Sequence, residues 1–324
     1  MASKVFISGA LGFIGKALAD RYREQGAEVG GVDLKADAES GVVAGDIREE
    51  GDWQQAAEGC DLVVHTAAYV GFGGDRDEVW RSNVLGTRRV LDAAIRGGAK
   101  RFVHFSSVTT FGFDFPDGVE ETWPVRITGD PYPDSKIAAE QVVMAAHIAG
   151  EVPVTIVRPG DVYGPRSRGW TVLPVKMIKS GQMVLPAGGH GRIGIVYVDN
   201  LVDGVMLAAE SDKAVGEIFT IADGDSVEVG EFFAYYARML GKQRPKTLPT
   251  PFAKGIAAVG GEILRRVGQD TELSAGSVDY VAKEHGRYSI EKARTVLGYE
   301  PKVTLEEGMR RCEEWLRSEG LLQS

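Results

Sequence analysis

Short apolar runs alternate with helical patterns along the first half of the chain. The apolar runs, rich in Val and Ile, are KVFISG (4–9), AEVGGVD (27–33), CDLVVHTAA (60–68), KRFVHFSS (100–107) and VPVTIVRPG (152–160). Helical periodicity fills segments between them, such as FIGKALADRYREQG (13–26), NVLGTRRVLDAAIRGG (83–98) and DSKIAAEQVVMAAHIAG (134–150). Strands of this kind, separated by helices, form a parallel sheet that helices cover on both faces. The pattern therefore predicts an α/β fold with a doubly wound, parallel Rossmann sheet.

The pattern changes after Gly164, where the chain becomes rich in Gly, Pro and basic residues. The segment IGIVYVDNLVDGVMLAAE (193–210) then predicts one more strand and helix of the core, and the chain is irregular from about residue 223. We therefore expect two parts: a Rossmann domain of residues 1–165, to which 193–222 return, and a smaller, interleaved C-terminal lobe of residues 166–192 and 223–324.

Composition narrows the class of protein. The formal net charge is -9 and the pI is near 5.2, and an acidic surface repels nucleic acid. No run of 18 apolar residues predicts a membrane span. No signal segment precedes the first strand, and Cys60 and Cys312 match no metal-ligand spacing. We expect a cytoplasmic protein with two structural thiols, no metal site and no nucleic-acid partner.

A glycine-rich turn joins the first predicted strand to the first helix. Gly9, Gly12 and Gly15 follow KVFIS directly and open the helix. The first glycine permits a tight turn, the second lets backbone approach a pyrophosphate, and the third lets helix and strand pack closely. Asp33 ends the second strand, where a carboxylate accepts hydrogen bonds from ribose hydroxyls and repels a 2'-phosphate. This favours NAD over NADP, although Lys35 lies nearby.

Tyr132 and Lys136 are candidates for proton transfer. They are four residues apart, so a helix places them on one face, where the ammonium lowers the pKa of the phenol. Tyr288 and Lys292 repeat the spacing, but outside the Rossmann half, and we interpret them as a solvated helix face. Ser106 and Ser107 end a strand at the ligand-binding edge of the sheet, where a hydroxyl can polarise a substrate oxygen.

These residues resemble the extended short-chain dehydrogenase/reductases, the NAD-dependent epimerase/dehydratase family. The resemblance covers essentially the whole chain. Its motifs, in order, are GALGFIG (9–15), Asp33, Asp46-Ile47, HTAA (65–68), SNVLGT (82–87), SSVTTFG (106–112), YPDSK (132–136) and RPGDVYGP (158–165). The resemblance implies a catalytic set of Ser107, Tyr132 and Lys136, with NAD as cofactor. It also implies a homodimer, formed through helices near 82–97 and 134–150.

The resemblance further assigns residues to the cofactor. They are Gly9, Gly12, Phe13, Ile14, Gly15, Asp33, Asp46, Ile47, Ala67, Ala68, Asn83, Ser106, Tyr132, Lys136, Pro159 and Val162. Asp46 and Ile47 would flank the adenine, and Pro159 and Val162 would line the nicotinamide side. Phe111 stands where the family usually has Tyr, a departure that we expect to affect packing.

Two substrate classes compete. Nucleotide-sugar 4-epimerases and dehydratases normally carry an Asn where this chain has Gly160-Asp161, and an acid is unfavourable beside a diphosphate. Arg192, however, stands where such enzymes often bind the diphosphate. YPDSK, VYVDNLVDG (196–204), YSIEKARTVLGYEPKVTLEEG (288–308) and the apolar stretch 248–264 instead resemble the 3β-hydroxysteroid dehydrogenase-like branch. We favour interconversion of a secondary alcohol and a ketone on a hydrophobic, sterol-like small molecule. A dinucleotide sensor without catalysis is the third interpretation, which the presence of Tyr132, Lys136 and Ser107 disfavours.

Overall fold

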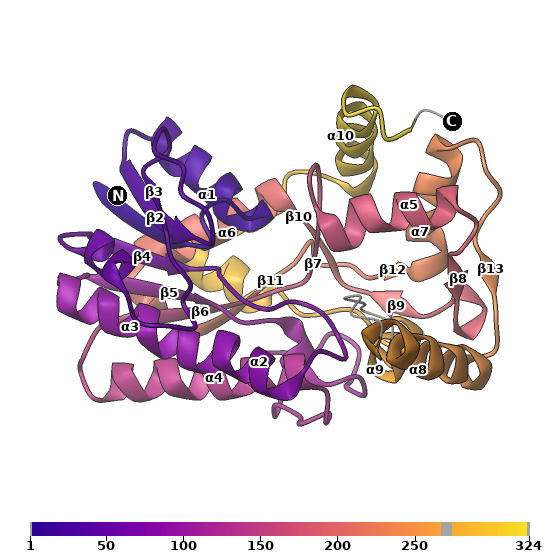
Figure 1. The fold of residues 1–324 in the computed structure, drawn as a ribbon, viewed down its shortest axis with the longest axis horizontal. Coiled ribbons are helices and arrows are strands. Elements are labelled where there is room, and N and C mark those ends of the chain that lie inside the picture. Colours follow the sequence, from indigo (N-terminus) through magenta and orange to yellow (C-terminus); the bar gives the residue numbers. More distant parts are fainter. Residues whose placement is uncertain (1, 267–273, 323–324) are drawn as a thin grey trace.

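A seven-stranded parallel sheet forms the larger part of the molecule (Figure 1). The computed structural model describes residues 2–266 and 274–322. The strands are β1 (Lys4–Ser8), β2 (Glu28–Asp33), β3 (Val42–Ala44), β4 (Leu62–His65), β5 (Arg101–Phe105), β6 (Val154–Pro159) and β11 (Ile218–Ile221). Their order is β3-β2-β1-β4-β5-β6-β11, and all neighbours are parallel. The order reverses between β1 and β4, the point at which such sheets bind dinucleotides. The predicted Rossmann fold is confirmed.

Helices cover both faces of the sheet because successive side chains of a strand point to opposite faces. Val5 and Ile7 of β1 share a buried cluster with α1 (Phe13–Glu24) and α6 (Val198–Glu210). Phe6, between them, belongs to a second cluster with α3 (Gly86–Gly97) and α4 (Pro131–Ile148). α2 (Arg76–Trp80) leads into α3 through a π-helical turn, Arg81–Leu85.

The smaller part of the molecule is built from short strand pairs and helices. The pairs are β7 (Asp161–Tyr163) with β10 (Ile195–Tyr197), β9 (Arg192–Ile193) with β12 (Val227–Glu228), and β8 (Val184–Leu185) with β13 (Lys246–Thr247). The helices are α5 (Leu173–Lys179), α7 (Val229–Met239), α8 (Thr250–Arg266), α9 (Ala275–Ala282) and α10 (Leu305–Ser318). Further single turns are Asp52–Ala57, Val108–Phe111, Arg168–Val172, Ala187–Gly189, Asp212–Ala214 and Ala293–Leu297. Figure 1 shows this lobe beside the carboxyl edge of the large sheet.

The strand expected near residue 195 forms, but it does not extend the large sheet, so that part of the prediction is wrong. Ile195 of β10 lies opposite Asp161 of β7 in a separate parallel pair. Only Gly160 separates β6 from β7, and a Cβ on it would lie 2.4 Å from the carbonyl oxygen of Gly194. The two segments therefore touch at backbone level and pair with each other. The strand that returns to the large sheet is β11, beside β6.

None of the helices in the described ranges is long and apolar enough to cross a membrane. Cys60 and Cys312 are buried, free thiols. Burial raises the pKa of Cys312 to about 11, which keeps it protonated and unreactive at neutral pH.

Candidate active site

Glycines shape the loop between β1 and α1. Gly9 has a φ of 74°, a left-handed conformation that favours glycine, and its N–H donates to the carbonyl of Val32 at 2.8 Å. A Cβ on Gly15 would lie 2.0 Å from the carbonyl oxygen of Gly9, so α1 can pack against the loop only with glycine there. Gly12 is the N-cap residue and Phe13 starts the helix. The N-terminus of α1 thus has no side-chain cap on its N–H groups, a geometry that fits a pyrophosphate.

Asp33 is fixed against this loop. Its Oδ2 accepts a hydrogen bond from the N–H of Leu11 at 2.9 Å, and its Oδ1 accepts one from the N–H of Leu34 at 2.7 Å. The carboxylate therefore lies beside the glycine turn at the end of β2. This is the placement from which a carboxylate reaches adenosine ribose hydroxyls.

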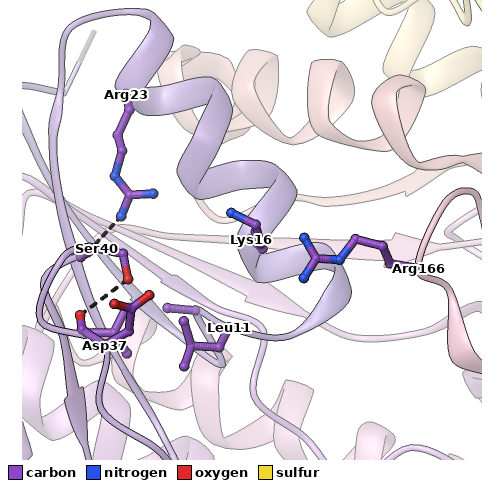
Figure 2. Close-up of a pocket in the computed structure, with 8 residues that line it drawn as sticks. Leu11, Lys16, Arg23, Asp37, Ser40 and Arg166 are labelled. Atoms are coloured by element: carbon purple, nitrogen blue, oxygen red, sulfur yellow. Dashed lines mark hydrogen bonds between the residues drawn. The ribbon is translucent and has the colours of Figure 1, made fainter. Parts of the chain in front are cut away.

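A cavity of about 190 Å³ opens beside the same loop (Figure 2). Its lining comprises Ala10, Leu11, Lys16, Arg23, Asp37, Ser40, Val42 and Arg166. Arg166 extends from the segment after β7 toward α1, which carries Lys16 and Arg23. Lys16 and Arg23 also pair with Asp20 at 3.1 Å and 3.5 Å, so Arg166 brings a further positive charge to the cavity. The glycine motif gave no signal for Arg166, because that residue is far away in sequence.

The segment that carries the predicted cofactor residue Ala67 lies next to the loop. A Cβ on Gly9 would come within 2.9 Å of the backbone nitrogen of Ala67, so the segment after β4 touches the glycine turn. Asp46 binds the Arg48 side chain at 2.7 Å, and this hydrogen bond holds the pKa of the carboxyl below its usual value. Ile47 is buried. The cofactor contacts of these residues stay predictions.

Tyr132 and Lys136 lie in the first turns of α4. Asp130 caps this helix, its carboxylate accepting from the N–H of Tyr132 at 3.2 Å. Lys136 is buried, and its Nζ donates to the carbonyl oxygen of Phe105 at 2.8 Å. Burial lowers the pKa of Lys136 to about 8. Because Phe105 is the last residue of β5, this hydrogen bond ties the Tyr–Lys face of α4 to the strand end that leads into Ser107.

The two serines after β5 have different surroundings. Ser107 Oγ accepts hydrogen bonds from the N–H of Thr109 at 3.1 Å and from its Oγ1 at 2.9 Å. With both acceptor positions used, its own proton is left to donate. Ser106 Oγ instead donates to Glu140, which forms a buried ion pair with Arg158 at 2.7 Å. Ser107 therefore keeps its hydroxyl proton for another acceptor, whereas the Ser106 hydroxyl is bound to a buried ion pair.

Asn83 links two sides of the site. It lies in the π-helical turn before α3 and is buried. Its amide group donates to the carbonyl of Tyr69 at 3.0 Å and to Ser135 Oγ at 2.9 Å, and its oxygen accepts from the N–H of Tyr69 at 2.7 Å. These bonds fix the segment after β4 against α4, which accords with a structural role.

The second Tyr–Lys spacing is not a solvated helix face, and that interpretation is wrong. Tyr288 is 1% exposed, and it pairs with Val119 in an isolated bridge. Its ring stacks on Phe111 at 5.9 Å and lies 5.2 Å from Phe115. Phe111 thus acts through packing, as expected. The error arose because Tyr288 buries its ring against residues that are distant in sequence.

An aromatic wall stands beside Tyr132, and the sequence pattern did not reveal it. The Phe72 ring lies 6.3 Å from that of Tyr132 and 5.2 Å from that of Tyr280 in α9. Phe113 lies 6.0 Å from Phe72 and 5.7 Å from Tyr280. We name Phe72, Phe113 and Tyr280 the aromatic wall. Its members come from three separate segments, so no local motif marks it.

The apolar stretch 248–264 contains most of α8. Ala253 and Ala257 are buried against Val278 of α9. Phe252, Ile256 and Val259 are more than 60% exposed. α8 therefore packs on α9 through its small residues and leaves larger apolar side chains exposed.

Pro159 and Val162 flank Asp161 at the carboxyl edge of β6. All three lie where a doubly wound sheet binds its ligands. In the sequence, Asp161 is a departure from the nucleotide-sugar motif, and no motif predicts a role for it in the site.

The Rossmann sheet, the glycine loop and the acid at the end of β2 define the class of a dinucleotide-dependent enzyme. The model of the NAD dependent epimerase/dehydratase family matches residues 5–222. The chain belongs to this family, and its cofactor is NAD.

Relatives within this class act on different substrates. The chain is 28% identical to a 3-beta-hydroxysteroid dehydrogenase of Mycolicibacterium neoaurum, covering 95% of this chain and 90% of the relative. It is 27% identical to 4-hydroxy-2-methyl-3-oxo-4-farnesyl-3,4-dihydroquinoline-1-oxide ketoreductase of Stigmatella aurantiaca, covering 94% of each chain. The structure of MoeE5 in complex with UDP-glucuronic acid and NAD is similar, with a TM-score of 0.77, 25% identity, and coverage of 98% of this chain and 99% of that one.

Proposed function

We propose that the protein interconverts a secondary alcohol and a ketone on a hydrophobic, sterol-like substrate. One observation carries the proposal: Ser107, Tyr132 and Lys136 come together at the end of β5, beside the aromatic wall. The Lys136–Phe105 hydrogen bond joins the helix to the strand end, and Phe72 packs against Tyr132. Chemistry for an alcohol oxygen therefore adjoins a surface that suits apolar rings.

The residues divide the work on the reacting oxygen. The glycine loop and Asp33 would hold NAD, which would supply the hydride acceptor. Tyr132 takes the proton of the alcohol, because the cationic Lys136 on the same helix face favours the phenolate. Ser107 donates a hydrogen bond to the same oxygen, since Thr109 already occupies its acceptor positions. In the reverse direction Tyr132 returns the proton.

The charge near the wall supports a hydrophobic substrate over a nucleotide sugar. Asp161 is buried at the start of β7, near the aromatic wall through its hydrogen bond with Tyr280. Its carboxylate and the nearby Lys283 ammonium balance each other, so this part of the site offers no net positive charge to bind a diphosphate.

One observation favours the second candidate, a nucleotide-sugar 4-epimerase or dehydratase. Arg192 lines an open cavity of about 620 Å³ with His285 and Arg287. Asp117 and Asp225 share that cavity, however. The Arg192 guanidinium already donates to Ser226 at 2.8 Å. A diphosphate would have to displace this contact and approach two carboxylates.

Tyr132→Phe tests the mechanism. It removes one oxygen and keeps the ring, so oxidation of 3β-hydroxysteroids with NAD should slow by ~10²-fold or more, the usual worth of a positioned acid or base. NADH formation measures the rate, and calorimetric titration should show nearly unchanged NAD binding. Tyr288→Phe, which removes the hydroxyl of the other tyrosine with this spacing, is the matched control and should keep its rate.

Two results would contradict the proposal. Normal turnover in Tyr132→Phe would place the acid/base elsewhere. Epimerisation of UDP-glucose by the wild-type protein, with no oxidation of any steroid alcohol, would establish the second candidate instead.

A further inference from the structure

Three ionisable side chains lie buried together next to the aromatic wall. Asp161, Tyr280 and Lys283 are 6%, 3% and 4% exposed. Removing charges from water is costly unless partners satisfy them. The bonds within this group therefore show what it is arranged to do.

Interactions within the group hold the three side chains, but they do not satisfy the second carboxylate oxygen of Asp161. Tyr280 donates its hydroxyl proton to Asp161 Oδ1 at 2.7 Å. Lys283 Nζ donates to the carbonyl of Tyr280 at 3.0 Å and lies 3.5 Å from the centroid of that ring. Asp161 Oδ2 has no hydrogen-bond partner within the part of the chain that the structure describes. Buried carboxylate oxygens normally accept hydrogen bonds, so this one is ready for a donor.

The place of this oxygen in the fold points to substrate. Only one residue, Gly160, separates Asp161 from the end of β6, at the edge of the sheet where ligands bind. The ring of Tyr280, its hydrogen-bond partner, contacts Phe72, and Phe72 contacts Tyr132. The ring of Phe72 thus lies between Tyr280, which holds the carboxylate, and Tyr132, the proposed acid/base. The separation of these two groups suits a rigid ligand with a polar group at each end.

Charge selects the kind of donor. Burial raises the pKa of Asp161 to about 6 and lowers that of Lys283 to about 8, so both are charged at pH 7. Lys283 therefore already balances the carboxylate, and a second cation would leave a net buried charge. A neutral hydroxyl satisfies Oδ2 without adding charge.

We propose that Asp161 is a specificity-determining residue whose Oδ2 accepts a hydrogen bond from a second hydroxyl group of the substrate, remote from the carbon that is oxidised. Tyr280 and Lys283 are positioning residues that hold the carboxylate. The substrate is then an apolar, ring-containing alcohol with a polar group at each end. This inference rests on the proposed function.

The test compares matched 3β-hydroxysteroids that carry no further oxygen, or one further hydroxyl at each of three positions on the distant rings. For the wild-type protein, kcat/KM with NAD should favour at least one diol over the mono-alcohol by ~10-fold or more, because a site built to bond a hydroxyl rejects its absence. In Asp161→Leu/Lys283→Met, which replaces both charges by apolar groups, the preference should fall to about one.

Two further variants guard against misfolding and indirect effects. Asp161→Asn keeps the shape of the side chain, and the preference should decrease because a neutral amide oxygen is the weaker acceptor. Asp223→Asn is the matched control, and it should retain the preference. Both Asp223 oxygens already accept hydrogen bonds, from the N–H of Tyr197 and from Asn200.

The outcomes separate the two proposals. Equal kcat/KM for mono-alcohol and diols in the wild type, or a preference that survives in both Asp161 variants, overturns the role of Asp161 and leaves the proposed function standing. Failure of the wild type to oxidise any member of the set overturns the proposed function, and this inference with it.

Discussion

Replacing Lys136 by Met should separate stability from activity. The substitution keeps an unbranched side chain of similar length and removes the buried ammonium group. Turnover should fall sharply and NAD binding should weaken, because Lys136 is expected to hold the nicotinamide ribose and to lower the pKa of Tyr132. The protein without cofactor should nevertheless become more stable.

The size of this effect follows from the burial of Lys136. The pKa of its ammonium falls from 10.5 to about 8. At about 1.4 kcal/mol per pKa unit, the charged form destabilises the folded state by about 3 kcal/mol at pH 7. Leaving the buried Phe105 carbonyl without this donor offsets about 2 kcal/mol of this, the typical cost of an unsatisfied buried acceptor. Lys136→Met should therefore gain about 1 kcal/mol at pH 7.

The pH dependence has a definite sign. Between pH 8 and 10.5 the unfolded chain keeps the Lys136 proton while the folded protein releases it, so the wild-type protein gains stability as pH rises. The penalty is fully present below about pH 8 and is gone above 10.5. Lys136→Met lacks this change. The difference in unfolding free energy should shift by about 3 kcal/mol toward the wild type across this range.

Urea denaturation of both proteins without NAD, at intervals from pH 7 to 10.5, measures this difference. Other titrating groups, Lys283 among them, are common to both proteins and cancel. Lys292→Met is the matched control from the other Tyr–Lys spacing. It loses an ion pair with Glu217 at 2.7 Å, so it should lose stability at pH 7. A constant difference between wild type and Lys136→Met over the whole range would refute the reasoning.

Other substitutions test neighbouring parts of the site. Ser107→Ala should lower turnover by ~10²–10³-fold with intact NAD binding. Ser106→Ala should mainly lower the thermal midpoint, because it breaks a hydrogen bond to buried Glu140. If steady-state rates fall more in Ser106→Ala than in Ser107→Ala, Ser106 is the catalytic hydroxyl. Wild-type protein should bind NAD more tightly than NADP, Asp33→Ser should narrow the gap in calorimetric titrations, and adding Arg166→Ala should widen it again; tighter NADP binding by the wild type would show that Asp33 does not face the ribose. Gly15→Ala should abolish NAD binding measured by the same titrations, since its Cβ would lie 2.0 Å from a backbone oxygen; wild-type affinity in this variant would contradict the packing argument.

The features that the sequence predicted well are local ones. The glycine turn, the strand before it and the helix after it lie within one short segment, so spacing alone reports their geometry. The positive φ of Gly9 and the close approach at Gly15 follow from that spacing. The same holds for Tyr132 and Lys136, which one helix places on one face.

The features that the sequence missed depend on contacts between distant segments. β10 pairs with β7 because Gly160 and Gly194 approach each other, and no pattern around either glycine predicts the other as its partner. The spacing of Tyr288 and Lys292 predicts a solvated helix face, because spacing alone carries no information about Phe111, against which Tyr288 packs.

This difference explains why the sequence indicates the cofactor more clearly than the substrate. NAD meets the glycine loop and the end of β2, which are continuous pieces of chain with fixed spacing. The proposed substrate surface is assembled from residues as far apart as Phe72, Asp161 and Tyr280. These side chains meet only after α9 packs against the segments that carry Phe72 and Asp161. A substitution in α9 can therefore change which alcohol is accepted without altering any residue of the glycine loop or of the Tyr–Lys pair. Related chains with one cofactor motif can for this reason differ widely in substrate, and the contacts of α9 are where that choice should be sought.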